Sequence, residues 1–148
     1  MAPRYHHTQI GTLLLGVLGG GVCLLGLALA VVGFNRVVLA ALVCLAACLG
    51  LFPTLTVTLD DRALRIRFGP GLIRKSFPLE GIEACRVVRN PWFYGWGIHR
   101  TPAGWLYNVS GLQAVELTLR SGKTLRIGTD EPETLAMAIR GSLTDLPG

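Results

Sequence analysis

The chain has 148 residues, enough for one domain and little more. Apolar residues make up 51% and charged residues only 16%, below the ~25% that is usual in a soluble domain. The net charge of +5 is too small an excess to indicate a nucleic-acid-binding protein.

The first third of the chain is almost free of charge. Residues 1–9 are polar and are predicted to form an N-terminal arm, in which His6 and His7 are more simply a polar flank than metal ligands. Ile10–Phe34 contains no charged residue over 25 positions. As a helix it would measure about 37 Å, longer than the ~30 Å hydrocarbon core of a bilayer. We therefore expect a first membrane span at 10–34.

A second apolar run follows after only two residues. Val37–Phe52 would give a helix of about 24 Å, so we expect the span to include Asn35 and Arg36 and to occupy 35–53, ending at Pro53. A cleaved signal peptide is the alternative, with an A-x-A triplet at 28–30. The preceding apolar run of about 18 residues exceeds the ~7–15 of a signal peptide, which favours the span.

The short connection predicts a tight helical hairpin that is integral to the lipid bilayer, with two spans. Small residues such as Gly16 and Gly20 are predicted to let the two helices approach each other. Arg36 is the only charge at the hairpin tip, whereas arginines such as Arg4 and Arg62 flank the other end. Because positive charge stays cytoplasmic, both termini and the C-terminal domain are expected in the cytoplasm.

From residue 54 onward, apolar residues alternate with polar ones, which is typical of β-strands. Seven strands are expected, joined mostly by short turns that favour an antiparallel meander. They are residues 54–59, 63–68, 72–79, 82–88, 105–109, 113–120 and 124–128. A C-terminal helix follows, with a capping box at Asp130 and Glu133 and an apolar face at Leu135, Ile139 and Leu143. The fold class is therefore α+β, with a barrel or sandwich over 54–148 that the helix closes.

One segment carries a resemblance to a known family. The sequence GWGIHRTPAGWLYNVSGLQAVELTLRSGKTLRIGTDEPETLAMAI, from Gly95 to Ile139, resembles a block of the bacterial PH-like (pleckstrin-homology-like) domain membrane proteins. The resemblance extends over about residues 54–142. It implies a PH-like seven-stranded barrel behind a two-helix anchor in the bacterial inner membrane, and it implies no established reaction.

Basic residues gather on two neighbouring predicted strands. Arg65 and Arg67 alternate with apolar residues, and Arg74 and Lys75 follow the Gly69–Gly71 turn. An antiparallel pair would bring Arg65, Arg67 and Arg74 together, and such a cluster binds phosphate or anionic headgroups. A solvated strand face is the alternative interpretation. These four residues are the candidate anionic-lipid contacts.

A second candidate surface lies in the aromatic stretch 90–111. Trp92, Phe93, Tyr94 and Trp96 are candidates for a contact with the membrane interface or a partner protein, because Trp and Tyr collect in the headgroup layer. Trp96 is expected to pack along the barrel. Further on, Trp105, Tyr107 and Val109 alternate and are expected to face the core.

No catalytic, metal-binding or cofactor-binding motif is recognisable, and the few cations near the aromatics argue against nucleic acid. We therefore expect no enzyme, cofactor or metal site. The expected function is a membrane-anchored module that contacts a protein or anionic lipid. The alternative is a structural or assembly subunit of a larger membrane complex.

Overall fold

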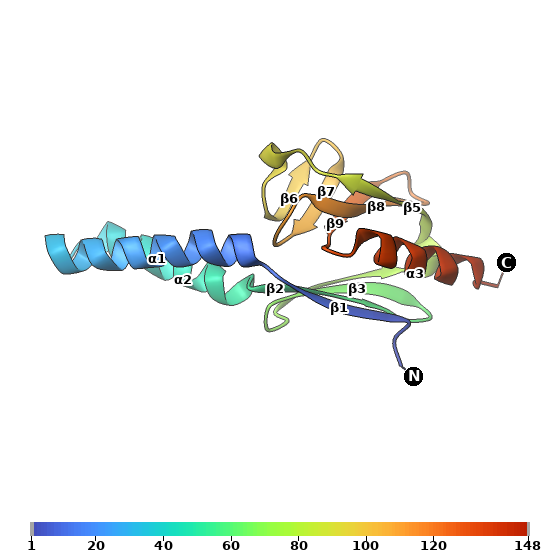
Figure 1. Cartoon of the computed structure of the whole chain (residues 1–148), viewed down its shortest axis with the longest axis horizontal. Helices are drawn as coiled ribbons and strands as arrows, with labels where there is room; N and C mark the ends of the chain where they lie inside the picture. Colours follow the sequence, from blue (N-terminus) through green and yellow to red (C-terminus); the bar gives the residue numbers. More distant parts are fainter. Residues whose placement is uncertain (1, 148) are drawn as a thin grey trace.

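The computed structural model describes residues 2–147, which form a helical hairpin and a β-rich domain (Figure 1). The hairpin projects from one end of the domain, and the C-terminus lies at the opposite end. This mixed α+β arrangement agrees with the expected fold class. The predicted segments 1–9 and 54–148 extend to residues 1 and 148, which lie outside the described range.

The hairpin consists of α1 (Thr12–Val32) and α2 (Arg36–Leu51). Gly33 supports the tight connection, because its φ of 99° is a conformation that other residues rarely adopt. Asn35 begins α2, and its side-chain oxygen accepts hydrogen bonds from the backbone nitrogens of Val37 (2.9 Å) and Val38 (3.2 Å). The connection therefore occurs where the sequence predicts it.

The two helices differ in length. The 21-residue α1, with a mean hydropathy of 2.4, is long and apolar enough to cross a membrane, whereas α2 has 16 residues. The described residues thus hold one helix that meets both criteria, where two were predicted. The helices come close at Gly21, where a Cβ atom in place of hydrogen would lie 3.0 Å from the Leu45 side chain. At the predicted Gly16 and Gly20, such an atom would have no neighbour within 4 Å.

The first sheet contains a strand that the sequence analysis missed. Residues expected to be a polar arm form β1, which pairs with β2 from Tyr5 opposite Leu59 to Ile10 opposite Thr54. The sequence of β1 is mostly polar and does not alternate between apolar and polar residues, so it gave no strand signal. The strand is stabilised by its pairing with β2 and by the burial of Tyr5. The antiparallel order is β1 (Tyr5–Ile10), β2 (Thr54–Leu59), β3 (Ala63–Phe68) and β4 (Ile73–Pro78).

The second sheet has five strands and is not a pure meander. Its order is β5 (Ile82–Arg89), β8 (Gln113–Leu119), β9 (Thr124–Gly128), β7 (Gly104–Asn108) and β6 (Gly97–Thr101). The β7 and β9 strands run parallel, and β6 forms within the connection that was predicted to lack strands. The described chain therefore has nine strands in two sheets, which corrects the predicted seven-stranded antiparallel barrel.

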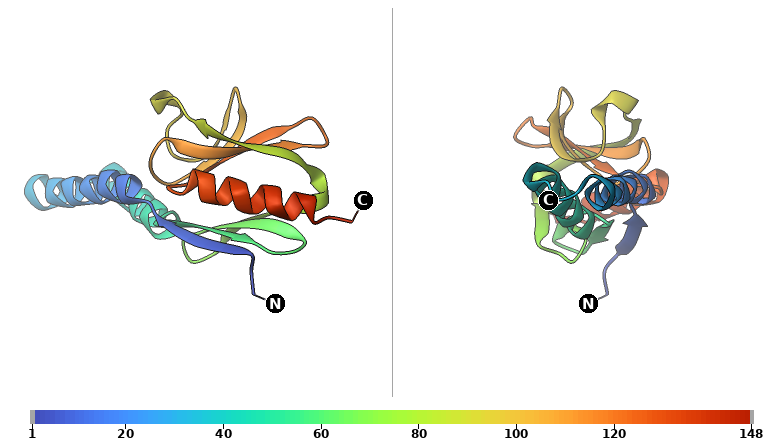
Figure 2. Two further views of the ribbon diagram at one scale, coloured as in Figure 1. Left: turned by 45° about the vertical axis from the view of Figure 1, so that its right-hand side comes forward. Right: turned by 90° about the vertical axis from the view of Figure 1, so that its left-hand side faces the viewer.

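A single hydrophobic core lies between the sheets, and α3 (Pro132–Thr144) closes one side of it (Figure 2). Leu135 and Ile139 are fully buried as predicted, and Leu143 packs against the same core. The predicted capping box is wrong, because α3 begins after Glu131 without a side-chain cap. Thr129 instead accepts a 3.0 Å hydrogen bond from the nitrogen of Glu131.

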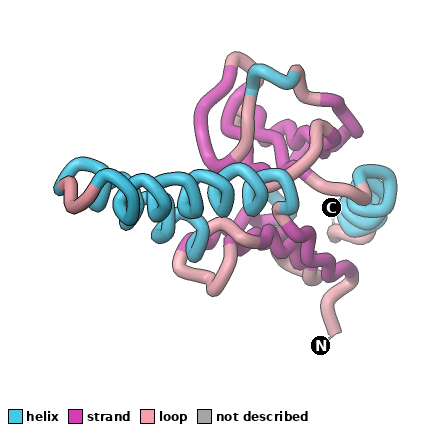
Figure 3. The backbone as a smooth tube through the Cα atoms, turned by 60° about the vertical axis from the view of Figure 1, so that its left-hand side comes forward, coloured by secondary structure: helices cyan, strands magenta, loops and turns pink. Residues whose placement is uncertain are grey.

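The hairpin joins the domain through close backbone contacts, which we call the root (Gly11 and residues 51–53). The nitrogen of Gly11 donates a 2.9 Å hydrogen bond to the carbonyl of Pro53. A Cβ on Gly11 would lie 2.9 Å from Val109, so only glycine fits here without a shift. Phe52 packs edge-on against Phe68, with ring centroids 5.6 Å apart. These contacts connect the root to Phe68 of the first sheet and to Val109, which follows β7 of the second sheet. Figure 3 shows the hairpin meeting the strands at this end of the domain.

Candidate functional site

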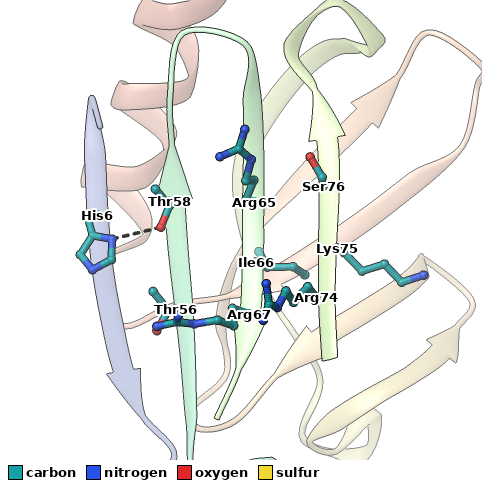
Figure 4. A pocket seen from close by; sticks show the side chains of 9 residues that line it. All are labelled: His6, Thr56, Thr58, Arg65, Ile66, Arg67, Arg74, Lys75 and Ser76. Atoms are coloured by element: carbon teal, nitrogen blue, oxygen red, sulfur yellow. Dashed lines mark hydrogen bonds between the residues drawn. The ribbon is translucent and has the colours of Figure 1, made fainter. Parts of the chain in front are cut away.

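The outer face of the first sheet carries two rows of polar side chains, because alternate residues of each strand point away from the core. One row crosses the sheet near the root and the other lies two residues further away. The near row is Thr8, Thr56, Arg67 and Arg74, and the far row is His6, Thr58, Arg65 and Ser76. An open groove of about 410 Å³ passes over both rows. Figure 4 shows its lining.

The near row brings two of the predicted basic residues together. Arg67 and Arg74 are direct cross-strand partners, although like charges in that position repel. Neither forms an ion pair with any residue between 2 and 147. Arg74 donates a hydrogen bond from Nε to the carbonyl of Gly71, and Arg67 extends over Thr56. Both guanidinium groups therefore remain available to bind an external anion.

Arg65 is on the same face but already has a counter-charge. Its Nη1 lies 3.0 Å from Oδ2 of Asp60. Hydrogen bonds from the backbone nitrogens of Arg62 and Ala63 lower the pKa of Asp60, so this carboxylate is charged at neutral pH. Arg65 lies opposite Ser76 and not opposite Arg74. The expected cluster of three arginines is therefore reduced to two, Arg67 and Arg74, which lack an acidic partner among the described residues.

Lys75 does not join the pair. It lies opposite Ile66, whose side chain is buried, so alternation places both side chains toward the other face, although both residues contribute to the groove lining. Because β4 is an edge strand, Lys75 remains exposed and projects away from Arg67 and Arg74 (Figure 4). The hydroxyl groups of Thr8 and Thr56, 2.9 Å apart, extend the near row on its other side. Alternation already assigned Thr56 to the polar face of its strand, but it missed Thr8 because it missed β1.

The aromatic stretch divides into exposed and packed members. Trp92 and Phe93 in the short helix η2 (Trp92–Tyr94) are 74% and 67% exposed. The Tyr94 ring instead lies over Arg126, 5.9 Å from centroid to guanidinium carbon. Trp96 is partly buried and donates a 3.0 Å hydrogen bond from Nε1 to the carbonyl of Gly111. Two of the four predicted contact residues therefore belong to the domain's own packing.

The prediction for β7 holds in part. Tyr107 and Val109 belong to the core, but Trp105, the second residue of β7, is 48% exposed. Leu106, which alternation assigned to the outside, is fully buried. The connection containing η2 passes over the outer face of this sheet, where Asn90 and Tyr94 contact Arg126, and this cover buries the second face.

The two histidines outside the groove have local partners. His99 forms a hydrogen bond with the carbonyl of Tyr94, and His7 lies 2.6 Å from Asp130. Among residues 2–147, no group of three or more His, Cys, Asp or Glu side chains is arranged to hold a metal ion. No protein-family model, curated protein or solved structure matches the chain.

Proposed function

We propose that this protein is a non-enzymatic, membrane-anchored module whose Arg67–Arg74 pair binds anionic lipid headgroups. The hairpin is the anchor and crosses the bacterial inner membrane twice, with α2 extended by its flanks. The domain is PH-like and cytoplasmic. The observation that supports the lipid-binding proposal most directly is that Arg67 and Arg74 are cross-strand neighbours with no acidic partner among the described residues.

Burial supports the anchor. Every described residue of α1 and α2 is at least partly exposed, although both helices are apolar apart from their first residues, Thr12 and Arg36. A water-exposed apolar hairpin of this size would be strongly unfavourable, whereas lipid accommodates it without cost. Arg36 at the tip can extend its charge toward the opposite headgroups, which compensates for the short α2.

The position of the pair supports a headgroup ligand. Thr56, in the near row, follows Pro53 of the root by three residues, or about 10 Å at ~3.3 Å per strand residue. The headgroup layer extends roughly 5–8 Å beyond the hydrocarbon on each side. Long arginine side chains at that height reach phosphates, and a guanidinium pair suits phosphate oxygens. The far row, with Arg65, is about 7 Å further away.

The test measures lipids that remain bound to the full-length protein. The protein is extracted from native membranes in mild detergent, and its retained phosphatidylglycerol and cardiolipin are counted by mass spectrometry. The double variant Arg67→Glu, Arg74→Glu is expected to lose anionic lipid. The control variant Arg120→Glu, Lys123→Glu has the same charge change at the β8–β9 turn, at the other end of β8 from the root.

The two variants separate a local site from a general effect of charge. Loss of anionic lipid in the first variant alone supports the proposal. Equal retention by the wild type and the Arg67, Arg74 variant contradicts it. Equal loss in both variants also contradicts it, because net charge and not the pair would then hold the lipid.

A further inference from the structure

We propose that two tips of the domain insert into the bilayer interface on either side of the hairpin and hold the domain in a fixed orientation. The first tip is η2, with Trp92 and Phe93. The second is the β3–β4 turn (residues 69–72), with Leu72. This inference rests on the proposed anchoring of the hairpin, and it adds a contact that anchoring does not require.

Both tips present large apolar side chains to solvent. Leu72 is 79% exposed, and Trp92 and Phe93 are 74% and 67% exposed. The two aromatic rings pack edge-to-face with centroids 6.0 Å apart, so they form one projecting unit. Such a unit gains free energy when it leaves water, and tryptophan in particular favours the membrane interface.

The first tip is fixed next to the root. On one side of η2, the nitrogen of Asn90 donates a 2.7 Å hydrogen bond to the carbonyl of Leu112. On the other side, Nε1 of Trp96 donates a hydrogen bond to the carbonyl of Gly111. Gly111 and Leu112 belong to the loop between β7 and β8. This loop also contacts the first turn of α1, where the hydroxyl oxygens of Ser110 and Thr12 are 3.3 Å apart. The β7–β8 loop therefore connects η2 to the start of the hairpin.

The second tip adjoins the end of α2. The nitrogen of Gly69 donates a 2.9 Å hydrogen bond to the carbonyl of Thr54. A Cβ on Gly69 would lie 2.6 Å from the carbonyl oxygen of Leu51, so the turn packs directly on the last residue of the helix. Leu72 follows three residues later. The turn therefore lies at the same end of the domain as the root.

The arrangement of the two tips favours a bilayer as their partner. Figures 1 and 2 show η2 and the β3–β4 turn at the hairpin side of the domain, one on each sheet, with the hairpin between them. A flat surface that the hairpin crosses would touch both tips at once. The membrane is such a surface, and it is continuous with the lipid around α1.

The test uses full-length protein in vesicles that contain bromine-labelled phosphatidylcholine, which quenches tryptophan on contact. Trp92→Phe is expected to remove most of the bromine quenching seen in the wild type. Trp105→Phe is the matched control, because Trp105 is also exposed but lies near the start of β7, about 13 Å along the chain from Val109, which contacts the root. This control should keep the quenching.

The second tip is tested in the Trp92→Phe background. Leu72→Trp should restore quenching, whereas Met137→Trp should not, because Met137 is 62% exposed on α3, which extends away from the hairpin. Unchanged quenching in Trp92→Phe, or an unquenched Leu72→Trp, overturns the inference. A third outcome also overturns it: bromine does not quench Trp92, but Trp92 becomes shielded from aqueous iodide as the protein concentration rises. That result would indicate a contact between copies of the protein.

Flotation of the vesicles separates this inference from the proposed function. Protein that floats with vesicles while Trp92 stays unquenched overturns the inserted tips and leaves the anchor intact. Protein that does not float overturns the anchor, and with it the inserted tips. Flotation together with bromine quenching at both tips supports the inference, whatever the lipid-retention result for Arg67 and Arg74.

Discussion

The Nε atom of Arg126 lies 2.8 Å from Oε2 of Glu116, and both side chains are largely buried, at 13% and 7% exposure. Arg86 contacts the other carboxylate oxygen at 2.7 Å. Arg126 also donates a 3.0 Å hydrogen bond to Asn90 and lies beneath the Tyr94 ring. This network connects β5, β8 and β9 to Asn90 and Tyr94, which lie on either side of Trp92 and Phe93 in the chain.

The substitution Glu116→Gln is expected to lower the free energy of unfolding by about 2–3 kcal/mol, because it leaves the Arg126 guanidinium buried without a carboxylate. The measurement is thermal or urea unfolding in detergent, followed by near-UV circular dichroism. Glu83→Gln on β5 is the control, since Glu83 is exposed, and it should change stability by less than about 0.5 kcal/mol. Equal effects of the two changes would contradict a structural role for the buried pair.

The same carboxylate predicts a dependence of stability on pH. Burial opposes ionisation of Glu116, but hydrogen bonds and charges from Arg126 and Arg86 outweigh it and lower its pKa. The stabilisation is therefore complete above the unfolded-state value of about 4.3 and is lost as pH falls toward the lowered folded-state pKa. As pH falls from about 5 to about 2, the unfolding midpoint of the wild type should therefore fall further than that of Glu116→Gln. Parallel curves would show that other groups cause the acid sensitivity.

The network also shows why the aromatic stretch could be predicted only in part. The sequence identified residues 90–102 as a long connection with too many aromatic residues for all of them to face solvent. It could not show which rings pack, because Tyr94 is held by Arg126, some thirty positions later in the sequence. Long-range pairs of this kind leave no period in the sequence. Leu106 was assigned outward for the same reason, since the cover that buries it comes from another segment.

A third prediction concerns β1, which the sequence analysis missed because its residues are mostly polar. Tyr5 is 8% exposed and belongs to the core, so Tyr5→Ala should lower the free energy of unfolding by about 3 kcal/mol. His6→Ala, next to it on the exposed face, should change stability by less than about 0.5 kcal/mol. Thermal unfolding in detergent measures both. If Tyr5→Ala behaves like His6→Ala, β1 does not contribute to the core.

The fold-level predictions succeeded where residues of one element share a face and failed where partners are distant. Alternation identified β2 and β3, whose apolar residues are buried at every second position, and the four-residue repeat identified α3. The arginine pair was partly foreseen, because a turn at Gly69–Gly71 makes the neighbouring strands antiparallel. The register that places Arg67 opposite Arg74 depends on that turn's geometry and could not be deduced from alternation.

Two glycines should respond oppositely to alanine. Gly104 has a φ of 100°, and a Cβ there would collide with the carbonyl oxygen of Thr124. Gly104→Ala is expected to cost at least about 2 kcal/mol, because it adds backbone strain at a packed strand. Gly141 in α3 has open space around its Cβ position, so Gly141→Ala should stabilise the protein by about 0.5–1 kcal/mol. Unfolding midpoints compare the two, and a stable Gly104→Ala variant would contradict the close approach of the strands.

The proposed two-span topology makes a prediction about accessibility. In a variant without the four native cysteines, Phe34→Cys would lie at the hairpin tip and Ser121→Cys in the exposed β8–β9 turn. A membrane-impermeant maleimide should label Phe34→Cys in intact cells whose outer barrier has been permeabilised, because the tip faces away from the cytoplasm.

Ser121→Cys is the control for that labelling and should react only after the inner membrane is broken. Labelling of both sites in intact cells would place the domain outside the cytoplasm. Protection of Phe34→Cys until the membrane is broken would mean that the 16-residue α2 does not complete a second crossing. The hairpin would then enter the bilayer from one side, and Arg36 would remain below the opposite headgroups, at a high desolvation cost. That cost is the physical reason to expect labelling at the tip.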